Sequence, residues 1–338
     1  MQKAIQRPVP DASALSGSRS TSPVFVVGCP RSGTTYLYHI LLSAGNFAIY
    51  RAESEVFHLL EPRFGNLSNP ANKKSLLAEW FNSRLFTATG LDAKTLEKQI
   101  MQRCTNGGDF LRIVMEGMAR DQGVKRWAEC TPDHILYLPR IHSTLPDALV
   151  IHIIRDGRDV ALSMEKQGWP KQLPWDKKER RMAGGLYWEW MIRRGRRDGA
   201  KLGPKYVEVR YEDLVSKPRE VLERLSSFID QELDYDEIQK RAIGSVGQPN
   251  TSFAEESGFI PVERWKKFYS SEQTAMFEEL TGESLEELGY QRLNKARKAS
   301  PAVSFFRAQY VATFETKFYL RTKTPLGRLF VDSDLSKM

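Results

Sequence analysis

Five short apolar runs alternate with segments of helical periodicity along most of the chain. The first run is continuous and rich in β-branched residues, which is typical of a buried parallel strand. After it, apolar residues recur at helical spacing from about Thr34 to Ala44, and Gly45 follows as a stop signal. The alternation predicts an α/β fold with a parallel sheet. The five runs span residues 23–28, 47–50, 126–130, 148–154 and 206–211.

A glycine-bounded turn between Gly28 and Thr35, GCPRSGTT, separates the first predicted strand from its helix. Backbone amides at such a helix start point toward one place and attract an anion. The spacing is close to that of the Walker A motif, but Thr34 stands where the Walker A lysine would be, and Arg31 lies within the turn. The turn is therefore poorly suited to a magnesium triphosphate and better suited to a nucleotide such as a phosphosulfate. The alternative is an ordinary strand–turn–helix connection.

Two carboxylates and a histidine follow the second predicted strand. Glu53, Glu55 and His58 stand directly after residues 47–50, where open α/β sheets place their chemistry. Glu53 and Glu55 would point the same way if the strand continued through them. The alternative, which these residues alone slightly favour, is a solvated acidic turn.

A second candidate anion site lies at the fourth predicted strand. Arg155 stands at its carboxyl end, and Ser163 follows on a helix expected over about 160–167. Arginine recognises phosphate with two parallel hydrogen bonds, and a hydroxyl adds one directed bond. The alternative, equally supported by these residues, is an ion pair of Arg155 with Asp156 or Asp159.

The segments between and after the strands shape the surroundings. Residues 66–108 are expected to form an insertion with helices around 76–80 and 95–104, which could shape a substrate pocket. Residues 242–261 are repeatedly broken by glycine and proline and could close over a nucleotide. Ser270 and Gln273 predict a capping box for a helix from about Ser271.

Composition narrows the function. The chain has 338 residues, a net charge of +8 and three cysteines without CxxC spacing, so we expect an anionic ligand, no structural zinc and a reducing, cytoplasmic location. No apolar run is long enough for a transmembrane helix. The basic end of the helix expected over 178–198 suits its dipole, so we expect no nucleic-acid partner. Residues 1–22 are typical of a disordered leader.

The chain resembles the sulfotransferases that use 3′-phosphoadenosine 5′-phosphosulfate (PAPS), in particular the bacterial-type branch related to the tyrosylprotein and heparan sulfotransferases. The resemblance covers about residues 23–290. Two motifs carry it most specifically, GCPRSGTT at 28–35 and IIRDGRDVALS at 153–163. Weaker support comes from VRYEDL at 209–214, and from RWKKFYSSEQ and LEELGY within 264–290.

The resemblance implies a P-loop-kinase-like, three-layer α/β/α fold with a central five-stranded parallel sheet in the order 2-3-1-4-5. It implies PAPS as co-substrate, without a metal, and sulfonate transfer to a hydroxyl acceptor by in-line displacement. Glu53 matches the catalytic base and ranks above Glu55 and His58. The implied nucleotide-binding residues are Arg31, Ser32, Gly33, Thr34 and Thr35 for the phosphosulfate, Arg155 and Ser163 for the ribose phosphate, Tyr211 for the adenine, and Arg264, Lys266 and Lys267 for closure, although this basic cluster could instead be surface.

One position departs from the family pattern. Many relatives carry Lys-Thr-Pro where this chain has Cys130, Thr131 and Pro132. That lysine is thought to stabilise the transferring group, so Arg31, Lys266 or His134 must cover its role, or activity is lower. This departure keeps open a non-catalytic binder of a sulfated nucleotide or glycan, and a degenerate P-loop kinase is a further alternative.

The tail has no counterpart in the resemblance. An aromatic residue recurs every four positions, which predicts a helix with one aromatic face. We expect this face to pack on the main domain or on a second subunit, with a membrane-surface helix as the alternative. The predicted division is a leader 1–22, a sulfotransferase domain 23–292 and a helical extension 293–338. The expected acceptor is a hydroxyl-bearing sugar, lipid, peptide or small metabolite. The aromatic positions are Phe306, Tyr310, Phe314 and Phe318.

Overall fold

A computed structural model of the protein describes residues 19–176, 180–248, 261–294 and 300–324. Five parallel strands form one sheet in the order β2-β3-β1-β4-β5. The register places Val24 of β1 beside both Ala128 of β3 and Leu149 of β4. The α/β class and the strand order are therefore confirmed. The strands are β1 (Val24–Val27), β2 (Phe47–Ala48), β3 (Arg126–Glu129), β4 (Leu149–Ile154) and β5 (Tyr206–Arg210).

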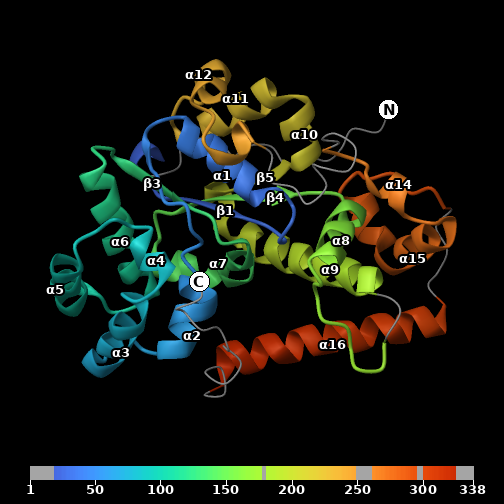
Figure 1. The fold of residues 1–338 in the computed structure, drawn as a ribbon. Helices are drawn as coiled ribbons and strands as arrows, with labels where there is room; N and C mark the ends of the chain where they lie inside the picture. Colours follow the sequence, from blue (N-terminus) through green and yellow to red (C-terminus); the bar gives the residue numbers. More distant parts are fainter. Residues whose placement is uncertain (1–18, 177–179, 249–260, 295–299, 325–338) are drawn as a thin grey trace.

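Helices cover both faces of the sheet, as expected for a three-layer fold (Figure 1). Successive side chains of a strand point to opposite faces, so Val24 and Val26 join one core and Phe25 and Val27 the other. The first core is completed by α1 and α10–α12, and the second by α6–α9 together with the insertion and the C-terminal helix. Both faces of every central strand are thus buried, which explains the continuous apolar runs.

Helices are present at the predicted periodic segments, and the structure adds helices that were not predicted, among them the 15-residue α6 (Gly107–Asp121). The capping box of Ser270 and Gln273 is present at the start of α15, and Gly45 follows α1 with a φ of +92°. The helices are α1 (Thr34–Ser43), α2 (Glu61–Phe64), α3 (Pro70–Trp80), α4 (Arg84–Thr87), α5 (Ala93–Arg103), α6 (Gly107–Asp121), α7 (Leu138–Thr144), α8 (Gly157–Lys166), α9 (Arg180–Gly199), α10 (Tyr211–Ser216), α11 (Pro218–Ile229), α12 (Tyr235–Arg241), α14 (Trp265–Phe268), α15 (Ser271–Glu287) and α16 (Pro301–Lys323).

Two local expectations differ from the structure. Strand β2 ends at Ala48, and the chain turns into a π-helix, Val56–Leu60, after Glu55 adopts a left-handed φ of 58°. The strand therefore does not continue through the two glutamates. Ordered chain also begins before residue 23, because Arg19 is buried and donates hydrogen bonds to the carbonyls of Phe228 and Pro204. Residues 1–18 of the expected leader, and 249–260 of the expected closing loop, lie outside the described residues.

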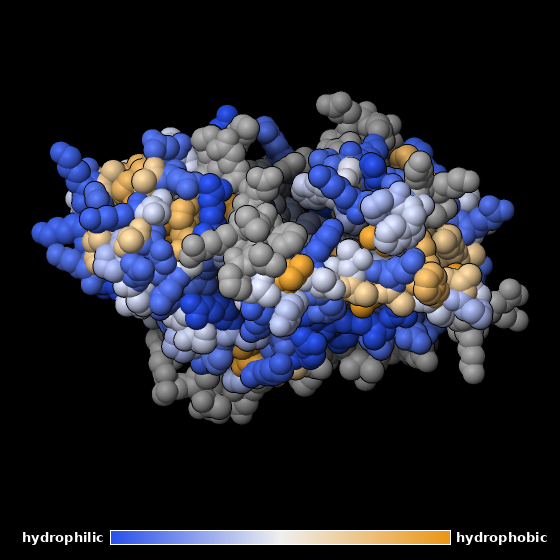
Figure 2. All heavy atoms as spheres, turned by 90° about the horizontal axis from the view of Figure 1, so that it is seen from below, coloured by the Kyte–Doolittle hydropathy of each residue, from blue (hydrophilic) through white to orange (hydrophobic). Residues whose placement is uncertain are grey.

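The aromatic face of α16 packs on the main domain. The helix runs beneath the other elements and contacts α9 and α15 (Figure 1). Tyr310 and Phe314 are buried, whereas Phe305 and Tyr319 are exposed. The face of the molecule seen from below is mostly hydrophilic, with small groups of hydrophobic residues (Figure 2). Among the described helices, none combines the length and the apolarity needed to cross a bilayer.

Candidate functional site

The turn after β1 is shaped by backbone conformations that few residues tolerate. Gly33 precedes α1 with a φ of +98°, and Arg31 has a φ of 72°. A Cβ on Gly33 would lie 2.4 Å from the ring of Tyr211, and one on Gly28 would lie 2.5 Å from the carbonyl oxygen of Ile153. Glycine is therefore required at both positions for steric reasons. The first amides of α1 have no acceptor within the helix and can therefore bind a ligand.

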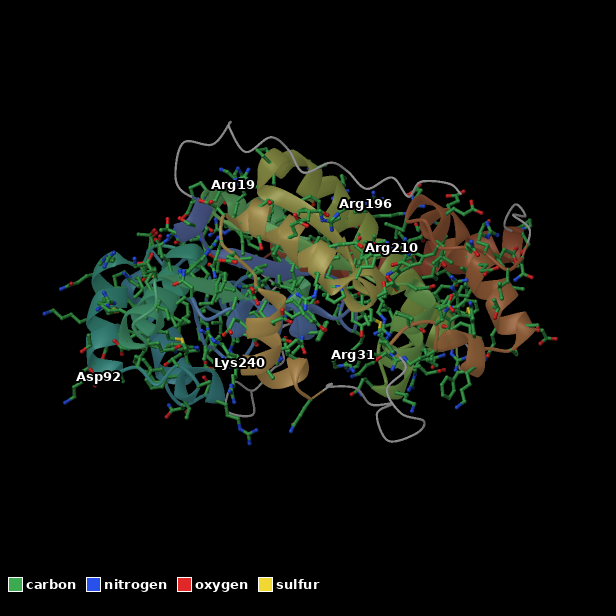
Figure 3. The ribbon with its side chains drawn as sticks, turned by 90° about the horizontal axis from the view of Figure 1, so that it is seen from above. Arg19, Arg31, Asp92, Arg196, Arg210 and Lys240 are labelled. Atoms are coloured by element: carbon green, nitrogen blue, oxygen red, sulfur yellow. The ribbon has the colours of Figure 1, made fainter. Side chains whose placement is uncertain are left out.

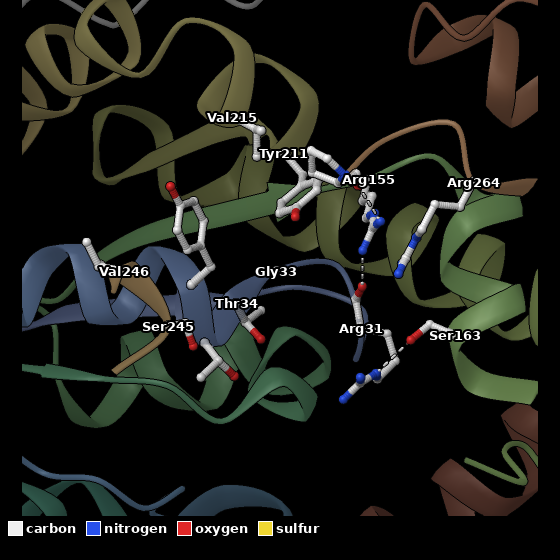
Figure 4. A pocket seen from close by; sticks show the side chains of 13 residues that line it. Arg31, Gly33, Thr34, Arg155, Ser163, Tyr211, Val215, Ser245, Val246 and Arg264 are labelled. Atoms are coloured by element: carbon white, nitrogen blue, oxygen red, sulfur yellow. Dashed lines mark hydrogen bonds between the residues drawn. The ribbon is translucent and has the colours of Figure 1, made fainter. Parts of the chain in front are cut away.

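A cavity opens above this turn at the carboxyl ends of β1, β4 and β5 (Figure 4). It brings together most of the predicted nucleotide-binding residues, although they come from distant parts of the sequence. Sequence reasoning gave no signal for Tyr36 and Val215, whereas Ser245 and Val246, which also line the cavity, belong to the segment 242–261 that is expected to close over a nucleotide. The predicted residues that line it are Arg31, Gly33, Thr34, Thr35, Arg155, Ser163, Tyr211 and Arg264.

Three arginines lie near one another on one side of this cavity (Figure 4). Burial lowers the pKa of Arg264 to about 10, and the neighbouring Arg155 and Arg31 add to the effect. Burial and Arg155 likewise lower the pKa of Arg31. Seen from above, Arg31 lies inside the outline of the molecule, whereas Asp92 stands at its edge (Figure 3). Like charges held this close repel each other, and a bound anion would relieve the repulsion.

Arg155 is held by several contacts at once. Its guanidinium stacks on Tyr211, with 4.4 Å from the guanidinium carbon to the ring centroid. It donates to the carbonyl oxygens of Pro261 at 2.7 Å and Arg31 at 3.3 Å, and it pairs with Asp159 at 3.5 Å. The ion pair that was the structural alternative is therefore present, but it is long, and Arg155 still lines the cavity.

The turn and α8 are joined by a hydrogen bond. Arg31 donates from Nε to the hydroxyl of Ser163 at 3.0 Å, and its two terminal nitrogens make no hydrogen bond to another described residue. Within the described residues, the buried hydroxyl oxygen of Ser32 and the Nε of Arg155 have no hydrogen-bond partner. Buried polar atoms without partners are costly unless a ligand satisfies them. These atoms fit a phosphate or sulfate group.

The two glutamates meet despite the absence of a continuing strand. Glu53 is an exposed residue, and its carboxyl lies close to those of Glu55, Asp133 and Glu129. Burial there, followed by Asp133 and Glu129, raises its pKa to about 7, whereas a hydrogen bond with Glu55 opposes this rise. Burial and the charge of Glu53 raise the pKa of Glu55 to about 9. At neutral pH the proton therefore resides on Glu55, which donates to Glu53.

His134 belongs to a closed hydrogen-bond network. Its Nδ1 lies 2.9 Å from the carboxylate of Glu129, and its Nε2 accepts from the amide of Phe57 at 3.3 Å. Its side chain is fully buried. Glu129 also accepts from the hydroxyl of Ser54 at 2.8 Å and from that of Thr131. Both ring nitrogens are occupied, so this arrangement does not support the catalytic role considered for His134.

The surroundings of His58 do not favour it as the catalytic base over Glu53. Its Nδ1 lies 2.8 Å from a carboxylate oxygen of Glu55. Burial, followed by the charges of Arg321 and His134, lowers its pKa well below the ordinary value. We therefore expect His58 to remain neutral at physiological pH and to support Glu55.

The basic residues after the glycine-rich loop separate into two groups. Arg264 is buried and lines the cavity, whereas Lys266 and Lys267 are exposed and are not among its lining residues. Lys266 instead pairs with Glu263 at 2.7 Å. Only the first member of the predicted cluster is thus placed where it can contact a ligand in this conformation.

The model of the sulfotransferase family matches residues 23–236, and a search of curated proteins gives no match. The sulfotransferase domain of the Synechococcus PCC 7002 olefin synthase is 16% identical, with a TM-score of 0.45, and the alignment covers 87% of this chain and 94% of that domain.

Two further solved structures are similar at the same low identity. A sulfotransferase of Mycobacterium tuberculosis H37Rv is 19% identical, with a TM-score of 0.40 and coverage of 69% of this chain and 72% of that one. Retinol dehydratase, in a complex with retinol and PAP, is 16% identical, with a TM-score of 0.44 and coverage of 82% and 84%.

Proposed function

Because the chain belongs to the sulfotransferase family, we propose that it transfers a sulfonate group from PAPS to the hydroxyl of an acceptor. The observation that carries this proposal is the cavity in which Arg31, Arg155 and Arg264 converge on the lysine-free turn. Three positive charges, of which that of Arg155 is paired with the carboxylate of Asp159, suit a ligand with two separate anionic groups. PAPS has such groups at the two ends of its ribose.

The binding roles follow from which residues are near one another. The amides after Gly33, the hydroxyl of Ser32 and the free nitrogens of Arg31 would hold the phosphosulfate end. Arg155 and Ser163, with Arg264 beside them, would hold the ribose phosphate. Tyr211 would lie by the adenine, with its ring already fixed by Arg155 and Gly33.

PAPS supplies an activated sulfonate group together with a stable leaving group, PAP. Glu53 would remove the proton from the acceptor hydroxyl as the new oxygen–sulfur bond forms and the bond from sulfur to the phosphate oxygen breaks. A base whose pKa lies near 7 is well matched to this step. Positioning and the fixed amide and guanidinium donors would supply much of the remaining acceleration.

The departure at Cys130 can be covered within the same site. Cys130 is buried and contacts the side chain of Thr34 through a hydrogen bond. His134 is held in its network and Lys266 is paired outside the cavity, so Arg31 is the best placed of the three candidates. We therefore assign to Arg31 the stabilisation of charge on the transferring group.

The direct test is a titration with PAP, followed by turnover of radiolabelled PAPS with a panel of hydroxyl compounds. We expect PAP to bind without magnesium and label to move to at least one acceptor. Binding without transfer would support the non-catalytic alternative, and magnesium-dependent binding of ATP in preference to PAP would support a kinase. The free, buried cysteines are consistent with the proposed cytoplasmic location.

A further inference from the structure

A second cavity, of about 350 Å³, lies between the main domain and α16. The helix supplies four of its lining residues, and the main domain supplies the others. Removal of α16 would therefore leave this cavity without one wall. The lining residues are Phe314, Lys317, Phe318 and Arg321 from α16, and His58, Asp133, Leu136, Tyr137, Tyr187 and Trp190 from the main domain.

The inner end of this cavity lies close to the proposed reaction centre. Asp133 lines the cavity and accepts a hydrogen bond from Tyr187 at 3.4 Å. The same carboxylate contributes to the raised pKa of Cys29, in the turn after β1, and to that of Glu53. His58, also in the lining, contacts Glu55 at 2.8 Å. A molecule in this cavity can thus present one end to the acids beside the turn.

The walls of the cavity are aromatic and mutually packed. The ring of Phe314 lies 5.3 Å from that of Tyr187 and 5.6 Å from that of Trp190, measured between centroids. Phe318 lies 5.5 Å from Tyr137. Rings packed in this way are rigid and bind flat apolar groups at low entropic cost. The body of a ligand here is therefore expected to be aromatic or otherwise flat and apolar.

Two cations in the lining differ from the other basic residues of this region. Arg194 pairs with Glu315 at 3.0 Å, and Arg307 pairs with Glu189 at 3.0 Å. Lys317 and Arg321 make no ion pair within the described part of the chain, and the buried Nε of Arg321 has no hydrogen-bond partner there.

The charge of Arg321 faces the cavity interior. It contributes to the lowered pKa of His58, and it opposes the burial that raises the pKa of Asp133. Asp133 is the one carboxylate in the lining against these two cations. The described lining therefore carries two cations against one carboxylate, and this net positive charge favours an anionic ligand group.

We propose that this cavity binds the acceptor, and that the acceptor is an amphipathic hydroxyl compound with a flat apolar body and an anionic group that pairs with Arg321. The proposal rests on the sulfotransferase function above. The hydroxyl points toward Glu53, the apolar body lies between the rings of α9 and α16, and the anion accepts hydrogen bonds from the guanidinium of Arg321, with Lys317 adding charge. The C-terminal helix is thus a specificity element.

The test uses two probes that differ only in charge, a hydroxynaphthoate and the corresponding hydroxynaphthamide, titrated calorimetrically into the full chain with PAP present. We expect the carboxylate to bind at least tenfold more tightly than the amide, because a charge-assisted bidentate pair is lost with the amide. Equal affinity for the two probes, or binding of neither, would overturn the proposal.

Variants then identify which residue is responsible for the preference for the carboxylate probe. Arg321→Gln should abolish the difference between the probes and leave the affinity for the amide unchanged, and Arg321→Lys should restore part of the difference. Phe314→Ala should weaken both probes alike. The control, Lys240→Gln, removes an exposed charge on α12 and should preserve the preference. A preference that survives Arg321→Gln contradicts the assignment.

The same experiment separates this proposal from the proposed function. Probe binding is measured directly and does not depend on turnover, and it can be repeated without PAP. Tight PAP binding with no discrimination between the probes would overturn the acceptor class alone. If Arg321 distinguishes the two probes in a protein that does not bind PAP, the proposal that PAPS is the donor is overturned. The proposal of an anion-binding cavity is then retained.

Discussion

Arg31 and Ser163 are 132 residues apart in sequence and are joined by a hydrogen bond of 3.0 Å between Nε and Oγ. The bond connects the turn after β1 to α8, the helix that follows β4. It fixes the guanidinium plane of Arg31 while leaving the two terminal nitrogens available. The two most specific sequence motifs of the chain are thus brought together by one side-chain contact.

Ser163→Ala tests whether that contact matters for binding. The loss of one charge-assisted hydrogen bond costs roughly 1.5–3 kcal/mol, so we expect the dissociation constant of PAP to rise by about tenfold or more. Calorimetric titration measures it. Ser143→Ala, which removes an exposed hydroxyl on α7, is the control and should leave the constant unchanged. An unaltered affinity in the Ser163 variant would contradict the role.

Arg155 and Arg158 belong to one motif but should respond differently to replacement by alanine. Arg158 is buried and pairs with Asp156 at 2.7 Å and Glu278 at 2.9 Å. Its removal would leave these buried carboxylates without a partner and should lower the free energy of unfolding by about 3–5 kcal/mol. Arg155→Ala should instead weaken PAP binding by about a hundredfold with a smaller loss of stability. Denaturant titration and calorimetry measure the two effects.

The interpretation fails if the two variants behave alike. Equal PAP affinity in wild type and Arg155→Ala, together with a large loss of stability, would make Arg155 a structural residue like Arg158. The pair with Asp159 would then be its main role.

Glu53→Gln should separate chemistry from binding. We expect unchanged PAP affinity and a fall in kcat of about 10²- to 10⁴-fold, the usual contribution of a general base. Because the base acts ionised and its pKa lies at about 7, wild-type kcat/KM should fall as pH drops below that value. A limb near the ordinary glutamate pKa of about 4.3, or full turnover in the variant, would place the base elsewhere.

Glu55 should act through Glu53. At neutral pH it is protonated and donates to Glu53, so Glu55→Gln keeps a donor and should retain most turnover. Glu55→Leu removes the donor that favours ionised Glu53 and therefore raises the pKa of Glu53. The acidic limb of the pH–rate profile of this variant should move to higher pH. Rate profiles of the two variants measure this. Coincident limbs in the two variants would show that the hydrogen bond is unimportant.

The raised pKa of Glu55 also makes the stability of the fold depend on pH. Glu55 titrates higher in the folded protein than in the unfolded chain, so folding favours its protonated form. The stability that protonated Glu55 contributes to the folded protein is fully present at pH values below the pKa of Glu55 in the unfolded chain. This contribution is lost as the pH rises toward about 9, the pKa of Glu55 in the folded protein. Glu55→Gln should therefore become more stable than wild type as pH increases across this range, as measured by thermal unfolding. A difference that does not change with pH would contradict the assignment.

The strands and the anion turn could be predicted because their signals are local. Apolar runs mark β1 and β4, and a turn with Gly28 and Gly33 has a direct steric meaning. The convergence of Arg155 and Arg264 could be anticipated only through the family resemblance, since neither spacing nor charge pattern relates two segments 109 residues apart.

Other features depend on tertiary structure, so at most part of them could be predicted from the sequence. The meeting of Glu53 and Glu55 arises from a left-handed residue and a π-helix rather than from the expected strand. The network around His134 requires Glu129 from β3. The aromatic face of α16 was predicted from its periodicity, but the cavity that it completes with Tyr187 depends on docking against α9.

The central claim is that the turn after β1 and Arg155 together recognise a nucleotide with a phosphate on its ribose and an anion at its far end. Parallel calorimetric titrations with PAP and with AMP, which lacks the ribose phosphate, test it most directly. The account predicts that PAP binds at least a hundredfold more tightly than AMP without magnesium, and that Arg155→Ala removes most of the difference. Equal affinities for PAP and AMP in the wild-type protein would contradict it.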